Sequence, residues 1–401
     1  MVITIFVIVY VGMVRGRLPG LALDRPAIAL LGAVALLVTR RVSLDEALVA
    51  VDVPTLGLLF GLMLVSGQFR VAGAYSAVTR YIAAWPAHPQ WLLAAVILVC
   101  GLLSALLAND IVCLAVTPLL AEGTLRRGLD PKPHLLAVAC ASNIGSAATL
   151  IGNPQNMLIG QRLHLSFLGY LGDGVLPAAV GLLLLWLWLR RRADRRTQDQ
   201  SVPSVDAPAF DAGQAVKGIV VLAALLLAFL CTAWPRELIA LAAGGVMLVS
   251  RRVSSRRLLR TVDWRLLLLF IGLFVVNHAL AAAGYVARAL EGSAAAGIPL
   301  AHPPALFAAA VVLSNLVSNV PAVMLLLPAA THPSAGAVLA LASTLAGNLF
   351  IVGSIANIIV VDQARRAGVN ISWREHARVG VPVTLMTLVG AAGWLWWRVQ
   401  G

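Results

Sequence analysis

The sequence is poor in charged side chains. Asp, Glu, Lys and Arg make up 12% of its 401 residues, whereas a soluble globular domain has about 25%. Hydrophobic residues reach 60% and occur in long continuous runs. The scarcity of charge excludes an ordinary soluble protein. The runs predict an all-α polytopic membrane protein, because a transmembrane helix needs roughly 20 mostly apolar residues.

The sequence also lacks the residue patterns of several functional classes. Its four cysteines lie inside apolar runs, without the spacing of a metal site. It has no G-x-x-x-x-G-K-[ST] loop, the motif that binds nucleotide phosphates, and no nucleophile constellation. We therefore expect no enzyme, no ATP-driven pump and no cofactor, apart from Na⁺ as a possible coupling ion.

The net charge of +13 does not indicate nucleic acid, because the basic residues lie in short loops between apolar runs. Such loops orient a membrane protein, with the side richer in Lys and Arg in the cytoplasm. If each half has five crossings and one re-entrant hairpin, the polar segment 191–213 lies on the richer side. Only six basic residues then lie on the opposite side: Arg40, Arg41, Arg162, Arg236, Arg288 and Arg398. We expect a cytoplasmic linker and, because the number of crossings per half is odd, inverted halves with both termini outside.

The chain is predicted to be an internal duplication. The repeats cover 1–190 and 214–401, with about five transmembrane helices each, and 191–213 joins them. VDVPTLGLLFGLMLV from Val51 resembles VDWRLLLLFIGLFVV from Val262, which pairs Asp52 with Asp263. Such weak internal repeats are typical of transporter folds.

Each repeat is predicted to contain a re-entrant hairpin, near 90–122 and near 303–330, with a second arm of only about a dozen residues in the first. Each also contains a broken span, at 135–160 and 335–361. Val71–Trp85 is less apolar and predicts an interfacial helix. The first apolar run, Val2–Val14, lacks the charged start and cleavage site of a signal peptide, so we expect it to be retained.

The first broken span is the most informative stretch. Gly145, Gly152 and Pro154 interrupt an apolar run that also carries seven uncharged polar side chains: Ser142, Asn143, Ser146, Thr149, Asn153, Gln155 and Asn156. Broken backbone at membrane depth survives only against protein or a water-filled cavity. Interrupted helices near the midplane are the best sequence indication of a transport site.

Four polar clusters fall into two symmetry-related pairs. The hairpin tips carry Asn109–Asp110 and Ser318–Asn319, and the broken spans carry Asn143–Asn156 and Asn348–Asn357. Inverted symmetry would bring them together near the midplane, where helix N-termini favour an anion. Unwound carbonyls and amide oxygens suit a hard cation such as Na⁺.

SNIGSAATLIGNPQN resembles the G-x-x-x-T-x-x-G-x-P-x-N signature of the ion transporter superfamily. That group includes divalent anion:sodium symporters, citrate-transporter-like permeases, arsenite permeases and a Na⁺/H⁺ antiporter family. The resemblance implies inverted five-span repeats, an elevator-type transport domain, a homodimer, and Asn109 and Asn319 at tips that line the site. The dicarboxylate branch reads Ser-Asn-Thr at both tips. Here they read Ala108-Asn109-Asp110 and Ser318-Asn319-Val320, which disfavours di- and tricarboxylates.

We predict a secondary transporter of a small anion, oxyanion or carboxylate in a bacterial inner membrane, coupled to Na⁺ or H⁺. The predicted substrate contacts are Asn109, Asn143, Gly145, Thr149, Ser318, Asn319 and Gly353. The predicted coupling residues are Asp110, Asn153, Asn156, Asn348 and Asn357.

Alternatives remain open at this point. In a cation/proton antiporter, Asp110 would be the exchanging carboxylate, although a site with a single acid disfavours this. Asp110 could instead cap the second hairpin arm. A non-transporting membrane scaffold is the alternative from another class, but it would not need broken helices.

Overall fold

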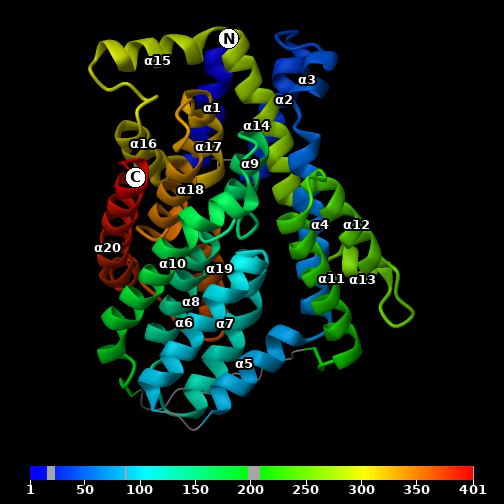
Figure 1. Cartoon of the computed structure of the whole chain (residues 1–401), viewed down its shortest axis with the longest axis vertical. Helices are drawn as coiled ribbons and strands as arrows, with labels where there is room; N and C mark the ends of the chain where they lie inside the picture. The colour runs from blue at the N-terminus through cyan, green and yellow to red at the C-terminus, as the bar shows by residue number, and fades with distance from the viewer. Residues whose placement is uncertain (16–22, 86–87, 197–207, 401) are drawn as a thin grey trace.

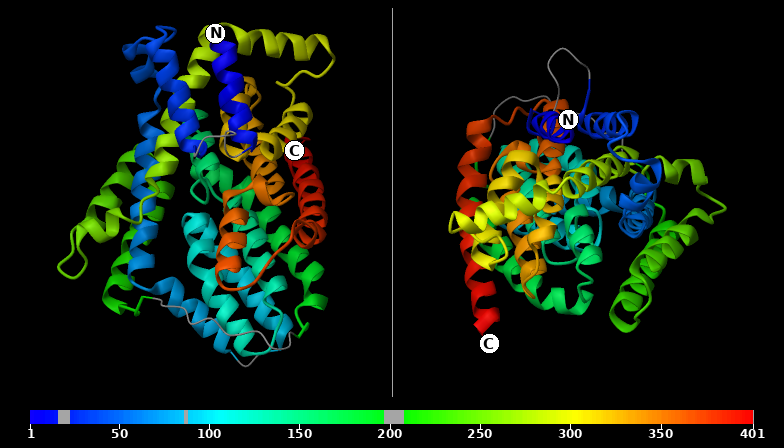
Figure 2. Two further views of the ribbon diagram at one scale, coloured as in Figure 1. Left: turned by 180° about the vertical axis from the view of Figure 1, so that it is seen from behind. Right: turned by 90° about the horizontal axis from the view of Figure 1, so that it is seen from above.

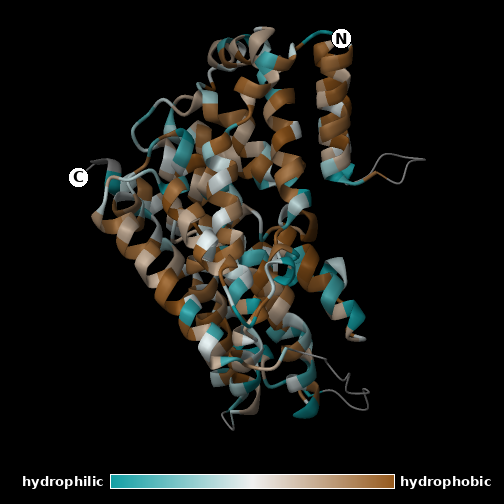
Figure 3. Ribbon diagram, turned by 90° about the vertical axis from the view of Figure 1, so that its right-hand side faces the viewer, coloured by the Kyte–Doolittle hydropathy of each residue, from teal (hydrophilic) through white to brown (hydrophobic). Residues whose placement is uncertain are grey.

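A computed structural model describes residues 1–15, 23–85, 88–196 and 208–400. Within these ranges the chain forms twenty α-helices and no β-strand, which confirms the all-α prediction (Figure 1). Six segments are long and apolar enough to cross a membrane: Val53–Val71, Pro89–Leu106, Phe167–Arg192, Ala212–Cys231, Trp264–Ala282 and Trp373–Arg398. Figure 3 shows hydrophobic residues along the long helices and hydrophilic ones gathered at loops and helix ends.

The helices occur in the same order in the two parts of the chain. The first ten are α1 (Val2–Arg15), α2 (Arg25–Val38), α3 (Leu44–Ala50), α4 (Val53–Val71), α5 (Ala74–Ala84), α6 (Pro89–Leu106), α7 (Asn109–Arg126), α8 (Pro131–Ser146), α9 (Pro154–Arg162) and α10 (Phe167–Leu189). The second ten are α11 (Ala212–Cys231), α12 (Arg236–Leu248), α13 (Ser255–Leu259), α14 (Trp264–Ala282), α15 (Tyr285–Ala295), α16 (Pro303–Val317), α17 (Asn319–Leu326), α18 (Ala335–Ala346), α19 (Ile355–Arg366) and α20 (Trp373–Gln400).

Two short amphipathic helices lie at opposite ends of the molecule. Figure 1 shows α5 across the lower end and α15 across the upper end. Each begins after a glycine with positive φ, Gly73 at 68° and Gly284 at 75°, a conformation that glycine adopts without strain. The helices before them, α4 and α14, therefore run in opposite directions, as inverted repeats require. We predicted the helix at Val71–Trp85 but not its counterpart α15.

In one group of helices, members of the first repeat pack against members of the second repeat. We call it the scaffold group: α1, α2, α4, α11, α12 and α14. Helix α4 packs on α12, and α14 packs on α2. Gly61 lies against the backbone of Ala240, and Gly272 lies against the backbone of Ala29. Small residues of this kind let membrane helices approach closely. Figure 2 shows α11 and α12 at the outer edge of the molecule.

The second group, the bundle group, consists of α6–α10 and α16–α20. The α6–α7 hairpin rises from the lower end toward the middle, and the α16–α17 hairpin descends from the upper end (Figure 1). The prediction that the second arm of the first hairpin has only about a dozen residues was wrong, because α7 has 18. The last helix, α20, begins at Trp373, because Ser372 and Glu375 cap its first turn reciprocally.

Candidate functional site

Both predicted broken spans are interrupted by a loop, which is buried throughout in the first span and exposes Phe350 and Val352 in the second. The first loop separates α8 from α9, and the second separates α18 from α19. Gly152 lies so close to the backbone of Ser104 and Ser146 that no side chain would fit. Asn153 then starts α9, because its Oδ1 accepts a hydrogen bond from the N–H of Asn156 at 2.9 Å.

The first polar cluster centres on Asn143, whose side chain is 1% exposed. Its Nδ2 donates to Oδ1 of Asn348 at 2.8 Å and of Asn357 at 3.2 Å. Its Oδ1 accepts from Ser354 Oγ at 2.9 Å and from Asn109 Nδ2 at 3.4 Å. The amide of Asn143 thus uses both donors and both acceptor positions, which fixes its orientation. We call these five residues the Asn143 cluster.

The second polar cluster centres on Thr344. Its Oγ1 donates to Asn156 Oδ1 at 3.2 Å and accepts from Asn153 Nδ2 at 3.2 Å and Gln155 Nε2 at 3.1 Å. With its amide oriented to suit its neighbours, Asn319 accepts from Gln155 Nε2 at 3.2 Å. In that orientation its nitrogen donates to the carbonyls of Ser343 and Gly353. The Thr344 cluster therefore consists of Asn153, Gln155, Asn156, Thr344 and Asn319.

The two clusters are built reciprocally. The register that pairs Gly152 with Gly353 also pairs Asn143 with Thr344, Asn153 with Ser354 and Asn156 with Asn357. Asn143 and Asn357 are hydrogen-bonded in one cluster, and Thr344 and Asn156 in the other. Each cluster thus joins a hairpin tip and the first half of one broken span to the second half of the other. We missed Thr344 and Ser354, and we named Gln155 as a polar residue of the first broken span without giving it a role. The register applied to Asn143 identifies Thr344.

Three other residues that we predicted to contact the substrate have a role in packing or in the local backbone geometry. The hydroxyl of Thr149 donates to the carbonyl of Ala105 at 2.6 Å and so ties the first loop to α6. Gly145 lies against the backbone of Gly101, where helices α8 and α6 approach closely. Ser318, at the second hairpin tip, has φ 76° and ψ 160°. This conformation is nearly exclusive to glycine, and such strain often occurs at functional positions.

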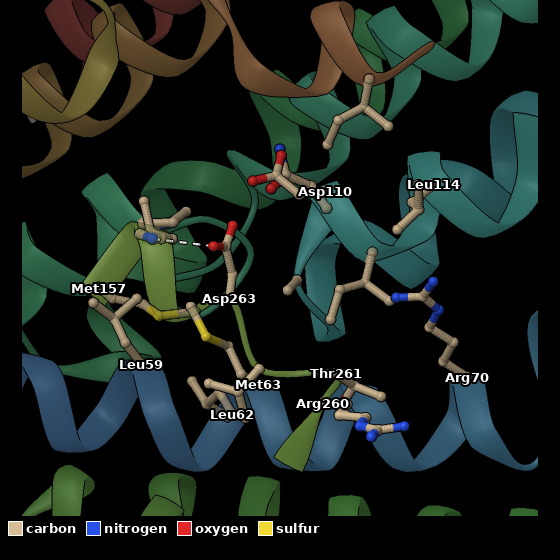
Figure 4. Close-up of a pocket in the computed structure, with 17 residues that line it drawn as sticks. Leu59, Leu62, Met63, Arg70, Asp110, Leu114, Met157, Arg260, Thr261 and Asp263 are labelled. Carbon is tan, nitrogen blue, oxygen red and sulfur yellow. Dashed lines mark hydrogen bonds between the residues drawn. The ribbon is translucent and has the colours of Figure 1, made fainter. Parts of the chain in front are cut away.

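A cavity of about 280 Å³ connects the first hairpin tip to the scaffold group. Figure 4 shows Asp110 from α7 and Asp263 from the start of α14, with their carboxylates pointing into the same part of the cavity. Arg70 and Arg260 line its other end. The prediction that Asp110 is the only carboxylate in the site was therefore wrong. The Asp52–Asp263 match already indicated the second one.

The alternative role of Asp110 as a helix cap was also wrong. Helix α7 begins at Asn109, its N-cap is Ala108, and no side chain caps it. Asp110 lies in the first helical turn instead, where the helix dipole favours a negative charge. Its neighbour Asn109 lines the same cavity and belongs to the Asn143 cluster, so the cavity leads to that cluster.

Several buried polar atoms around the two loops have no hydrogen-bond partner among the described residues. They are Ser104 Oγ, Ser314 Oγ, Asn315 Oδ1 and Asn348 Nδ2. Leaving such an atom unpaired costs about 1–3 kcal/mol. Buried unpaired groups of this kind are what a polar ligand or ion would satisfy. Within the described ranges, no group of three or more His, Cys, Asp and Glu side chains could hold a metal ion.

Comparison with known proteins gives consistent matches. A family model described as "Citrate transporter" matches residues 6–346. The chain is 31% identical to the silicon efflux transporter LSI3 of Oryza sativa subsp. japonica, over 93% of this chain and 92% of that protein. It is also 31% identical to the inner membrane protein YbiR of Escherichia coli (strain K12), over 85% and 87%. The YdaH transporter of Alcanivorax borkumensis shares the fold, with a TM-score of 0.56, 15% identity and coverage of 87% and 85%.

Proposed function

The chain belongs to the citrate transporter family of the ion transporter superfamily, and on this premise we propose that it carries a small anion or oxyanion across a bacterial inner membrane, coupled to Na⁺ or H⁺. The family consists of membrane transporters and not of enzymes. The sequence signature predicted this superfamily by resemblance, and the comparisons confirm that prediction.

The reciprocal clusters are the observation that carries the proposal. Four helices, α7, α9, α17 and α19, begin at or beside them. Helix N-termini present unpaired N–H groups and the positive end of the dipole, which stabilise an anion. The cluster side chains are amides and hydroxyls, which can both donate and accept. The cluster side chains are buried and bonded to one another, and Asn109 also lines the 280 Å³ cavity, so a compact oxygen-rich substrate would reach the clusters there.

The 280 Å³ cavity supports coupling to Na⁺ or H⁺. Asp110 and Asp263 supply carboxylate oxygens from the bundle group and from the scaffold group. Carboxylate and amide oxygens are ligands for a hard cation, and a paired carboxylate can equally carry a proton. We assign Asp110 and Asp263 to the coupling ion, with Asn109 between that ion and the substrate.

Contacts between the two groups support an alternating-access cycle of the elevator type. In the part of the molecule that the positive-inside rule assigns to the outer side, Arg162 of α9 pairs with Asp52 at 2.5 Å. Gln161 donates to Glu237 at 2.9 Å, and Arg236 donates to the carbonyl of Leu165. The cavity lies on the other side, toward Arg70 and Arg260. We interpret this arrangement as the state in which the site is closed from outside, with the linker in the cytoplasm.

Uptake by purified protein in liposomes tests the proposal. The panel contains sulfate, phosphate, arsenite, silicate, citrate and succinate, with silicate included because LSI3 is a silicon efflux transporter by name. Uptake of one anion that requires a Na⁺ or H⁺ gradient supports symport. Asn109→Ala and Asn319→Ala should abolish it. Asn277→Ala, a matched control, removes an intramembrane amide that pairs with Tyr10 outside both clusters and should retain uptake.

The second candidate is a cation/proton antiporter. The observation that favours it is the pair of carboxylates, Asp110 and Asp263, in one cavity. Proton release driven by Na⁺ or Li⁺, without any anion and lost in Asp110→Asn, would select this candidate. Failure of every anion and cation in protein that remains folded would refute both candidates. The homodimer implied by the family is tested by light scattering of the purified protein.

A further inference from the structure

An apolar groove of about 440 Å³ runs along the outside of the bundle group between α6, α8 and α10. We call it the α6–α10 groove. Its walls include Leu98 and Leu102 on one side and Leu183 on the other, each more than half exposed. Its floor is made of small residues, among them Gly145 and Ala148. All its lining residues are Gly, Ala, Val, Leu, Ile or Trp.

The groove faces the surface that a bilayer would cover. Both of its walls belong to helices long and apolar enough to span a membrane. An apolar groove in that position is filled by hydrocarbon without a hydrophobic driving force, because lipid tails are as apolar as leucine. Shape alone therefore does not select one lipid over another. Selection needs a polar feature at the end of the groove.

Such a feature lies at the end nearest the linker. Trp91 and Trp186 stack there with ring centroids 6.1 Å apart, and Trp186 Nε1 donates to the carbonyl of Gln90 at 3.1 Å. The guanidinium of Arg190 lies 5.4 Å from the Trp186 ring centroid. Arg191 and Arg192 follow directly, so this end of α10 carries three positive charges, although the guanidinium of Arg192 lies over Trp188, which does not line the groove. Tryptophan marks the membrane interface, where lipid headgroups lie.

We propose that the α6–α10 groove binds one acyl chain of an anionic phospholipid, with the lipid phosphate held by Arg190 and with Arg191 and Arg192 adding positive charge at the same helix end. The leaflet is the cytoplasmic one, which rests on the orientation given under the proposed function. Basic clusters at the cytoplasmic ends of membrane helices attract anionic headgroups. A zwitterionic lipid would fill the groove equally well but would gain little at the arginines.

The position of the floor connects this lipid to the transport site. Gly145 and Ala148 flank the end of α8, and their neighbour Asn143 is the centre of the Asn143 cluster. The acyl chain would therefore contact the outer face of the segment whose inner face carries the cluster. Occupancy of the groove would therefore support the geometry of the first loop.

Native mass spectrometry of the full-length protein, exchanged into micelles with phosphatidylglycerol or phosphatidylcholine, tests the lipid site. We expect retention of one phosphatidylglycerol and no selective retention of phosphatidylcholine. Arg190→Gln should weaken retention about fivefold, since one basic residue near the surface contributes about 1 kcal/mol. The control Arg251→Gln removes an exposed arginine from the α12–α13 loop and should leave retention unchanged.

Two further variants test whether the groove itself, and not the surface charge alone, retains the lipid. Ala179→Phe places a ring in the groove from an exposed position, so it should fold and should reduce lipid retention. Ala223→Phe adds the same ring on the exposed face of α11 and should not. Equal retention of both lipids, or unchanged retention in Arg190→Gln and Ala179→Phe, would overturn the proposal. So would dissociation of a dimer by Ala179→Phe, because a second copy would then occupy the groove. None of these readouts depends on transport, so they distinguish failure of the lipid site from failure of the proposed function.

Discussion

Replacement of Asn143 by alanine tests whether the cluster is a structural unit. The side chain makes four hydrogen bonds to three other helices or loops, and it is 1% exposed. In Asn143→Ala all four are lost at once. The variant also leaves polar atoms of its partners buried, since the alanine methyl group can neither donate nor accept.

The expected loss in the free energy of unfolding follows from the number of hydrogen bonds that are lost. Hydrogen bonds between membrane helices average about 0.6 kcal/mol each in double-mutant cycles, with a maximum of about 1.7 kcal/mol. Four average bonds give about 2.4 kcal/mol. Partners left unpaired in a buried site cost more, about 1–3 kcal/mol each in soluble proteins. We therefore expect Asn143→Ala to lower the free energy of unfolding by about 2–4 kcal/mol.

The assay is reversible unfolding of purified protein in mixed micelles, with Ser142→Ala as the matched control. Ser142 is the preceding residue of α8 and is equally buried. Its hydroxyl donates to the carbonyl of Ala139 in its own helix and accepts a hydrogen bond from the Sγ of Cys113. We expect Ser142→Ala to cost no more than about 1 kcal/mol. If Asn143→Ala is no more destabilising than Ser142→Ala, the reasoning from the cluster is wrong.

Three further predictions concern packing, conformational change and positioning. Gly61→Ala should lower stability by about 1–3 kcal/mol in thermal unfolding, because its Cβ would press on the α12 backbone, whereas Gly245→Ala has open space and should not. Arg162→Gln removes a partly exposed ion pair between the two groups, worth up to about 1 kcal/mol. It should shift the inward–outward equilibrium up to about fivefold in distance measurements between spin labels, and an unchanged equilibrium would contradict the assignment. Arg398→Gln breaks a pair inside the bundle group and should not shift it. His376→Leu removes a side chain 3.1 Å from a carbonyl of the second loop and should slow uptake more than His376→Gln does.

Much of the fold could be predicted because glycine, proline and charge leave strong local signals. Gly152 and Pro154 located the first loop correctly, since a helix cannot continue through them at membrane depth. The match of Asp52 to Asp263 is repeated in the structure, where each starts a helix by accepting a backbone N–H bond. The length of α7 was missed because the apolar run ends at Ala121, whereas the helix continues through the more polar residues up to Arg126.

The site was predictable only in part, because its contacts cross between the repeats. Asn109 and Asn143 were named from the sequence, and the structure brings them together. Thr344 was not named, because a threonine in an apolar helix has no local feature that marks it as a partner of Asn156. The roles of the remaining predicted residues in binding stay predictions. They are decided by the substrate, which amide and hydroxyl chemistry alone does not identify.

In the scaffold group, helices of the first repeat pack on helices of the second, and this has a consequence for the synthesis of the protein. Helix α4 leaves the ribosome long before α12, the helix on which Gly61 packs. At 5–20 residues per second, the interval is on the order of ten to thirty seconds. Throughout it, the close-packing face of α4 has only lipid or the insertion machinery beside it. The first half of the chain thus cannot complete its packing alone, and the membrane must hold it unfinished until the second half arrives.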